Sequence, residues 1–259
     1  MQDAPLTPLL SAERRQAILD RLEREGKVVV ADLVASLGVS DDTIRRDLRA
    51  LASSGLVERV HGGALPRPSQ PSRFVDRRDI DPAGKAAIGA AAARLVNSGD
   101  VVLTGGGTTV LQFARALPDD LRATVLTTGP DIAVALADVY SLDVCVIGGR
   151  IDPETRTVVG ADAVDTLRGV RADVCVLGVC SLHPETGLTV PHREEAMVVA
   201  AMIAGSERVV LIGGAEKLGT ASYFPVAGVE SITTLVTGGD VPDESLAPYR
   251  DAGIEVLRS

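Results

Sequence analysis

Residues 39–48 read Val-Ser-Asp-Asp-Thr-Ile-Arg-Arg-Asp-Leu, and residues 55–65 read Gly-Leu-Val-Glu-Arg-Val-His-Gly-Gly-Ala-Leu. The first run predicts a helix over 41–50 with one buried face, because three apolar residues recur at helical spacing, namely Ile44, Leu48 and Leu51. The second run is apolar and ends near a Gly-Gly pair, which predicts a short hairpin. A capped helix followed by a hairpin is the arrangement that a winged DNA-binding module needs.

The face of this helix opposite the apolar residues carries side chains suited to duplex DNA, since residues four apart share a face. Arginine binds phosphates and guanine edges, a carboxylate accepts from the cytosine amine, and hydroxyl groups contact the DNA backbone. The helix residues expected at DNA are Ser40, Asp42, Thr43, Arg45, Arg46 and Arg49. Ser40 is also a good N-cap. Arg59 and His61 of the hairpin are expected to reach flanking phosphates or the minor groove.

Two further helices are expected before the arginine-bearing one. Residues 11–25 form an amphipathic pattern that turns Ile18 and Leu22 inward, and residues 31–37 form a shorter one. Together the three helices and the hairpin predict a winged helix-turn-helix. The alternative is a small three-helix module for protein contacts, which gives no reason for so many exposed cationic residues.

The overall composition limits the classes of partner. The chain has 259 residues, is 46% hydrophobic and carries a net charge of −9, and residues 1–65 contain nine Lys and Arg against ten Asp and Glu. A wholly basic coat for nucleic acid is therefore excluded, and any DNA-binding surface must be local. Trp is absent and aromatic residues are 2% of the chain, which disfavours base stacking on single-stranded RNA. With no signal peptide and no long apolar run, we expect a cytoplasmic protein with no membrane partner.

The three cysteines predict no disulfide framework. Cys145, Cys175 and Cys180 are expected to be buried, reduced thiols. Cys180 and His183 are three apart, but no second pair of ligands accompanies them, so neither a metal nor a cofactor is expected.

The rest of the chain alternates between apolar runs and helical patterns. Before it, residues 1–10 are expected to be a disordered lead-in to the DNA-binding domain at 11–65, and residues 66–80 a Pro- and Ser-rich, extended linker. Residues 81–259 then form an α/β domain with a mostly parallel sheet. Strands are expected at 101–103, 124–127, 144–147, 174–177, 209–212, 234–236 and 254–256. Helices are expected near 83–97, 108–117, 130–139, 161–168, 193–204 and 243–249.

Glycine-rich loops follow several of these strands, at the edge of a parallel sheet where ligands bind. Gly106, Gly107, Thr108 and Thr109 lead into a helix and could bind an anion through backbone N–H groups and hydroxyls, although a tight strand-to-helix turn would need the same glycines. The loop lacks the spacing of a nucleotide-hydrolysing P-loop. Other candidates are Gly148, Gly149, Arg150, Lys217 and Glu195, and the two cations could equally be solvated. No catalytic constellation is predicted.

These residues resemble the DeoR family of bacterial transcriptional repressors over positions 11–237. The N-terminal signature consists of Asp32-Leu33, Leu37, Val39-Ser40, Thr43-Ile44-Arg45-Arg46-Asp47-Leu48, Leu51, Gly55-Leu56, Arg59 and His61-Gly62-Gly63-Ala64. The C-terminal signature consists of Lys85, Ile88, Gly107-Thr108-Thr109, Thr127, Gly148-Gly149, Gly160, Gly178, Gly187-Leu188-Thr189, Glu195, Met202 and Lys217.

The resemblance implies a sensor domain related to ribose-5-phosphate isomerase and to glucosamine-6-phosphate deaminase. It also implies a small effector, usually a phosphorylated sugar, that lowers affinity for the operator, and it adds Lys85 to the effector-binding candidates.

The chain departs from the family pattern at four polar positions. Gly105 stands where the family has Asp, Gly129 where it has Asn, Val199 where it has Lys and Gly214 where it has Asp. Our hypothesis is that the fold is kept, while the pocket is roomier and less suited to a small sugar phosphate.

We therefore expect a homo-oligomeric, DNA-binding repressor of carbohydrate or related metabolic genes, without enzymatic activity. Two alternatives stay open. One is a sugar-phosphate isomerase or deaminase fused to a DNA-binding module, and the other is a DNA-binding repressor that responds to no ligand.

Overall fold

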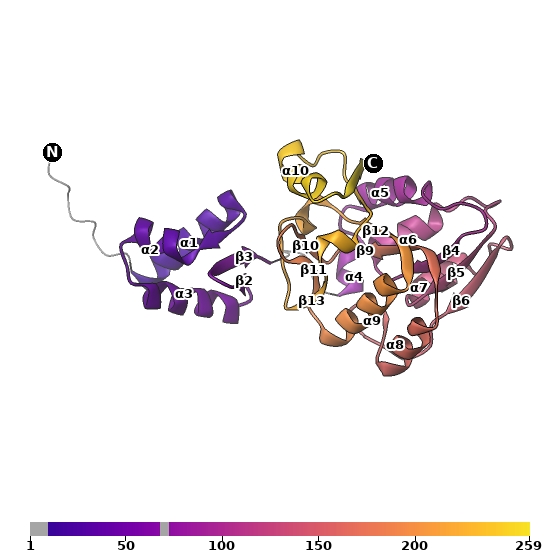
Figure 1. Cartoon of the computed structure of the whole chain (residues 1–259), viewed down its shortest axis with the longest axis horizontal. Helices are drawn as coiled ribbons and strands as arrows, with labels where there is room; N and C mark the ends of the chain where they lie inside the picture. Colours follow the sequence, from indigo (N-terminus) through magenta and orange to yellow (C-terminus); the bar gives the residue numbers. More distant parts are fainter. Residues whose placement is uncertain (1–9, 68–72) are drawn as a thin grey trace.

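The computed structural model describes residues 10–67 and 73–259, so the lead-in expected at 1–10 lies, except for Leu10, outside the described residues. A small N-terminal domain of helices and a hairpin stands beside a larger α/β domain (Figure 1). Within the described ranges, no helix is long and apolar enough to cross a membrane.

The N-terminal domain is the expected winged helix-turn-helix. Its elements are α1 (Ser11–Glu25), β1 (Val28–Val29), α2 (Val30–Leu37), α3 (Asp41–Ser53), β2 (Val57–Val60) and β3 (Gly63–Pro66). The apolar faces predicted from spacing meet in one core, which includes Ile18, Leu22, Leu33, Ile44 and Leu48. Strand β1 was not expected from the sequence. It pairs antiparallel with β3 and makes the wing a three-stranded sheet of order β1-β3-β2.

Two glycines are required by the backbone geometry of this domain. Gly38 ends α2 in the left-handed region, at φ 65°, and so turns the chain toward α3. Gly63 lies so close to β1 that a Cβ atom there would stand 2.0 Å from the carbonyl oxygen of Val28. A side chain at position 63 would therefore push β1 away from β3.

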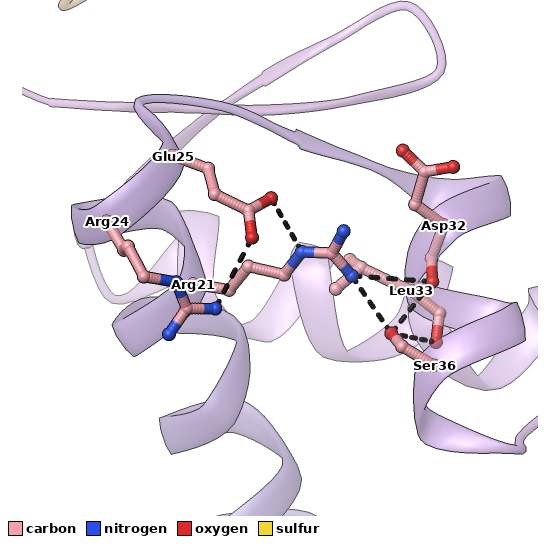
Figure 2. Close-up of polar contacts among 6 residues, drawn as sticks. All are labelled: Arg21, Arg24, Glu25, Asp32, Leu33 and Ser36. Atoms are coloured by element: carbon pink, nitrogen blue, oxygen red, sulfur yellow. Dashed lines mark hydrogen bonds and ion pairs between the residues drawn. The ribbon is translucent and has the colours of Figure 1, made fainter.

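Arg21 joins the first two helices (Figure 2). Its Nε donates to Glu25 Oε2 at 2.7 Å within α1, and its Nη1 donates to Ser36 Oγ at 3.0 Å on α2. Ser36 in turn donates to the carbonyl oxygen of Asp32 at 2.7 Å. The bond to Glu25 is the largest contribution to the raised pKa of Arg21. The angle between α1 and α2 is thus held by polar contacts at the surface as well as by the core.

The larger domain is built on a seven-stranded parallel sheet. Its order is β15-β14-β12-β9-β4-β5-β6, and every pairing in it is parallel. The strands are β4 (Val101–Thr104), β5 (Ala123–Thr127), β6 (Leu142–Val146), β9 (Ala172–Gly178), β12 (Ser206–Ile212), β14 (Thr234–Thr237) and β15 (Glu255–Arg258). Each of the seven predicted apolar runs overlaps one of these strands, so the predicted α/β class is confirmed.

Helices cover both faces of this sheet, which explains why its central strands are apolar throughout. The helices are α5 (Pro82–Ala93), α6 (Thr108–Arg115), α7 (Pro130–Leu136), α8 (Ala161–Arg168), α9 (Arg193–Ala204) and α10 (Asp243–Asp251). Val174 and Val176 of β9 pack with α5, α6 and α7, whereas Cys175 and Leu177 pack with α8, α9 and α10. This alternation along one strand divides the domain into two cores.

A second, three-stranded sheet faces the N-terminal domain and was not expected from the sequence (Figure 1). It consists of β10 (Ser181–His183), β11 (Gly187–Val190) and β13 (Phe224–Ala227), in the order β10-β11-β13. Lys27 of the N-terminal domain pairs with Glu185, in the turn between β10 and β11, at 2.8 Å. A two-stranded ribbon, β7 (Arg150–Ile151) with β8 (Val158–Val159), completes the domain with two short 3-10 helices at Ala215–Lys217 and Val229–Ser231.

The segment predicted as an extended linker is partly helical. Residues 68–72 lie outside the described part, but helix α4 (Phe74–Arg77) follows directly. Phe74 is buried in the core beneath α5 and α6, and its backbone N–H donates to the carbonyl oxygen of Glu154 at 2.7 Å. The apolar side chain of Phe74 thus attaches this part of the chain to the sensor domain.

The predicted burial of the cysteines is wrong for one of them. Cys175 is buried on β9 and Cys180 is half-buried, but Cys145 is exposed. Cys145 belongs to β6, the edge strand of the sheet, and an apolar run cannot reveal from sequence alone which strand will be at the edge.

Candidate DNA-binding surface and effector pocket

Helix α3 has the cap and the buried face that its sequence predicts. The Ser40 hydroxyl accepts a hydrogen bond from the Thr43 backbone N–H at 3.3 Å and lies 2.9 Å from the Thr43 hydroxyl. Ile44, Leu48 and Leu51 are buried. The rotation of the helix is therefore fixed, and its opposite face is held outward.

On that outward face, one arginine is held in an ion pair and two are not. Arg45 pairs with Asp41 within the helix, which raises the pKa of the arginine. Arg46 and Arg49 are exposed, and within the described residues neither is held by a hydrogen bond or an ion pair. Asp42 is exposed beside them. Arg46 and Arg49 are consequently the cations of this helix that are most available to DNA.

Asp47 is the residue of this helix that sequence reasoning missed. It is 2% exposed and accepts hydrogen bonds from Arg14 Nε at 2.5 Å and from Arg15 Nε at 3.2 Å. These bonds tie α1 to α3 beside the core. The signal was present, because an acidic residue three positions after Ile44 falls on the buried face, where it requires a cationic partner.

The wing presents the two residues predicted for it. Arg59 and His61 are exposed on the β2–β3 hairpin, which turns through Gly62 at φ 84°. The hairpin follows α3 directly and its strand β2 packs against that helix, so the two neighbouring elements together carry at least three exposed cationic groups.

In the larger domain, a cavity of about 200 Å³ lies where β4, β9 and β12 end. It is lined by Gly55, Arg67, Arg77, Lys85, Gly106, Gly107, Thr108, Thr109, Thr155, Thr157, Gly178, Val179, Cys180, Pro191, Glu195, Gly213, Gly214, Glu216 and Lys217. Seven of the ten predicted effector residues are in this lining, namely Lys85, Gly106, Gly107, Thr108, Thr109, Glu195 and Lys217. The edge of the sheet chosen from the glycine-rich loops is thus the edge that holds the cavity.

The other three predicted residues lie away from the cavity lining. Gly148 and Gly149 follow the edge strand β6, and Arg150 begins β7, where it pairs with Val159 of β8. The Arg150 side chain is exposed and pairs with Glu194. The sheet order explains the difference, because β6 stands at the end of the sheet, two strands beyond β4.

The cavity is cationic, with four Lys or Arg side chains against two carboxyl groups, Glu195 and Glu216. Lys217 is buried, which is the main reason that its pKa is lowered. The Lys85 ammonium donates to the carbonyl oxygens of Arg77, at 2.6 Å, and of Ile80, and burial lowers its pKa as well. Lys85 therefore has a structural role at the end of α4 in addition to its place in the cavity wall.

Arg77 was missed as a site residue, because its sequence position suggested a linker. Its Nε is buried and, within the described residues, has no hydrogen-bond partner. Only the packing of α4 against the sensor domain brings it to the cavity. An anion in the cavity would supply the missing acceptor.

Glu195, in the first turn of α9, is half-buried and brings a carboxyl group to the cavity. One of its oxygens, Oε2, is buried without a partner among the described residues. Burial is the main cause that raises the pKa of Glu195 to about 7, and His192 and Arg77 oppose this shift. Near neutral pH the group can therefore accept or donate a hydrogen bond. Among the described residues, no cluster of three or more His, Cys, Asp or Glu is arranged to hold a metal ion.

The four positions that depart from the family pattern gather around this cavity. Gly214 lines it, and Gly105 and Val199 line a smaller pocket beside it. Gly129 lies beneath the glycine-rich loop, where a Cβ atom would stand 2.8 Å from Gly106 Cα. All four positions thus lie at or beside the cavity, and their effect on the effector stays a hypothesis.

A winged helix-turn-helix joined to an α/β domain with a cationic cavity defines a DNA-binding regulator with a sensor domain. The DeoR-like helix-turn-helix domain matches residues 14–69, and the DeoR C terminal sensor domain matches residues 80–239. The chain belongs to the DeoR family of transcriptional regulators.

Relatives agree with this assignment. The chain is 33% identical over 251 residues to the HTH-type transcriptional regulator GlpR of Haloferax volcanii, covering 96% of this chain and 98% of that protein. It is 30% identical to the putative aga operon transcriptional repressor of Escherichia coli O157:H7, covering 95% and 93% of the two chains. Both relatives are named as transcriptional regulators. The α/β fold is similar to ribose 5-phosphate isomerase A of Methanocaldococcus jannaschii, with a TM-score of 0.39 and 14% identity over 53% of this chain and 54% of that one.

Proposed function

We propose that this protein represses carbohydrate or related metabolic genes and leaves its operator when a small anionic effector, such as a phosphorylated sugar or a related metabolite, fills the cavity. The observation that carries the proposal is that the cationic cavity of the sensor domain is also lined by Gly55, which follows α3, and by Arg67, which follows the wing. A ligand in the cavity would therefore lie against the part of the chain that carries the DNA-binding surface. The names of the relatives, which include an operon repressor, support the repressor role.

Arg67 is the contact through which the effector would act. Its guanidinium stacks on the Tyr223 ring, 3.9 Å from the centroid, and its Nη1 donates to the Tyr223 hydroxyl at 2.5 Å. Its Nε lies 3.9 Å from Glu58 Oε2 on β2, a carboxyl group whose pKa is raised by burial. Next to it, the carbonyl oxygen of Pro66 accepts from the Ala221 backbone N–H at 3.1 Å. One side chain thus contacts the wing, the sensor domain and the cavity.

An anion in the cavity would compete with Glu58 for Arg67. Strand β2, which carries both Glu58 and the DNA-binding residue Arg59, would then lose one of its attachments to the sensor domain. This gives the bound and free states different contacts, which an effector must have in order to shift an equilibrium.

The DNA contacts proposed for this role are the half-buried Thr43 and seven exposed residues, namely Ser40, Asp42, Arg45, Arg46, Arg49, Arg59 and His61. One such module spans few base pairs, so we propose that the protein binds as a homo-oligomer through the sensor domain, with half-sites about one helical turn, or a multiple of it, apart.

The test is binding of the full-length protein to the promoter next to its own gene, at fixed salt, with and without a panel of sugar phosphates. We expect nanomolar-range binding that at least one phosphorylated ligand weakens. Arg67→Met should bind the same DNA and lose the response to the ligand. Arg73→Met is the matched control, because Arg73 is exposed, pairs with Asp76 at 3.9 Å and does not line the cavity.

The outcomes separate the two parts of the proposal. Absence of promoter binding at low salt would contradict the repressor role. Binding that no anion affects would leave a repressor that responds to no ligand, a reading that the polar groups missing at Gly105, Gly129, Val199 and Gly214 would favour.

A further inference from the structure

A second, smaller pocket opens beside the effector cavity. Its volume is about 40 Å³, and it shares Gly106, Thr157, Gly178 and Glu195 with the main cavity. Since about 10–15 Å³ holds one water-sized group, it has room for roughly three such groups. We call it the side pocket.

The walls of the side pocket are mostly apolar. The apolar side chains that line it are Val158, Leu177, Leu188, Val190, Val198 and Val199. Its polar groups are the Glu195 carboxyl and the hydroxyls of Thr128 and Thr157, and the Thr157 hydroxyl already lies 2.7 Å from that of Thr155. A hydroxylated carbon placed deep in this pocket would find few partners, whereas an alkyl group would find apolar contacts on most sides.

Two of the residues that depart from the family pattern create this space. Gly105 lines the side pocket, and a Cβ atom on it would stand 3.1 Å from Leu177 Cδ2, so any side chain at 105 would occupy part of the pocket. Val199 supplies an apolar wall at the position where the resemblance leads to a lysine. The apolar character is therefore a property of this chain.

The entrance of the side pocket holds an unsatisfied polar atom. Glu195 lines both pockets, and its buried Oε2 lacks a partner among the described residues. The buried Arg77 Nε in the main cavity also lacks one. Because buried polar atoms are normally hydrogen-bonded, the two atoms indicate a ligand with an acceptor for Arg77 and a donor for Glu195.

We propose that the effector is an anion with a short alkyl end. Its negative group would lie against Arg77 and the 106–109 loop, a hydroxyl or amine would face Glu195, and one to three carbons without oxygen would fill the side pocket. This inference rests on the proposed function, which requires an anionic effector, and adds that the effector is not fully hydroxylated.

A matched set of ligands tests the inference by calorimetry on the full-length protein. The probes are inorganic phosphate, glycerol 1-phosphate and propane-1,2-diol 1-phosphate, the last two as racemates. The diol differs from glycerol only in carrying a methyl group where glycerol has CH₂OH. We expect the diol phosphate to bind at least about fivefold more tightly than glycerol 1-phosphate, because the extra hydroxyl of glycerol would lose its water in the apolar pocket without gaining a hydrogen-bond partner.

Val199→Thr is the informative variant, because it nearly keeps the shape of the wall and adds a hydroxyl. It should reduce the preference for the methyl group to about twofold or less and leave the affinity for inorganic phosphate unchanged. The control is Val134→Thr, at a position that is 76% exposed and remote from both linings. Circular dichroism checks that each variant is folded.

Two results would overturn the inference in distinguishable ways. If inorganic phosphate and glycerol 1-phosphate bind but the diol phosphate binds no more tightly, the apolar side pocket is not used and the proposed function survives. If none of the three anions binds, this inference and the effector part of the proposed function both fail, whereas the repressor role is decided by binding to the promoter.

Discussion

Arg46, Arg49 and Arg59 in the N-terminal domain are exposed and unpaired within the described residues, whereas Lys217, Arg77 and Lys85 in the sensor domain are buried or half-buried around a cavity. Exposed cations attract a polyanion over a long range and lose little water before they meet it. Buried cations have already lost part of their hydration. An anion that fits the cavity therefore replaces much of the favourable interaction that these cations lost with the water. The same residue types thus suit DNA in one region and a small ligand in the other.

The largest effect expected concerns the buried ion pairs that connect α1 to α3. Asp47→Ala removes the acceptor of Arg14 and Arg15 from a buried position. Removing one partner of a buried ion pair costs about 3–5 kcal/mol. Hydrogen exchange should therefore show lost protection in α1 and α3 with β9 and β12 unchanged. Asp42→Ala, at an exposed position of the same helix, should cost no more than about 1 kcal/mol. Equal protection in both variants would mean that Asp47 does not hold the two helices together.

The next effect concerns the recognition surface itself. Arg46→Ala should weaken binding to the operator by about tenfold or more, since a bidentate arginine–guanine contact contributes about 1–3 kcal/mol. Binding to unrelated DNA should change less, and a drop of about one in the salt slope would instead assign Arg46 to a phosphate. Arg115→Ala, an exposed arginine on α6, should change operator affinity less than twofold in the same assay. An unchanged operator affinity for Arg46→Ala would remove it from the DNA contacts.

The buried cavity predicts a pH dependence that the exposed surface does not. The pKa of Glu195 is raised to about 7, chiefly by burial, so the folded state favours the protonated carboxyl. The contribution of this group to the free energy of unfolding is fully present below the ordinary glutamate pKa. It is lost as the pH rises toward and through 7. In the Glu195→Gln variant, the side chain at position 195 cannot ionise. The free energy of unfolding of this variant relative to the parent protein should therefore grow between pH 5 and pH 8 by up to about 3 kcal/mol. A stability difference that stays flat over this range, in thermal melts, would show that Glu195 is ionised throughout.

The smallest effect concerns the contact between the two domains. Lys27 and Glu185 pair at 2.8 Å with both side chains more than half exposed, and the pairing lowers the pKa of Glu185. Such surface pairs contribute about 0.2–1 kcal/mol. A double-mutant cycle with Lys27→Met and Glu185→Gln should give a coupling energy in this range and change DNA affinity less than twofold. A larger change in affinity would mean that this pair, and not Arg67 alone, connects the domains.

The features of this protein that depend on local pattern could be predicted from its residues. The spacing of Ile44, Leu48 and Leu51 predicted the buried face of the recognition helix, and Ser40 predicted its cap. Apolar runs predicted the seven strands of the main sheet, and the glycine-rich loop predicted the edge that holds the cavity. These features follow from the periodicity of helices and strands and from where strands end, so no distant partner is needed to recognise them.

Contacts between residues from distant parts of the chain became known only from the folded protein. It brought Arg14 to Asp47, placed Arg67 and Arg77 at the cavity, and moved Gly148, Gly149 and Arg150 away from it. It also put Cys145 on an edge strand and paired β11 with β13 across more than thirty residues. Strand order and domain contacts depend on pairings between segments far apart in sequence, and the spacing of residues within one segment does not reveal those pairings.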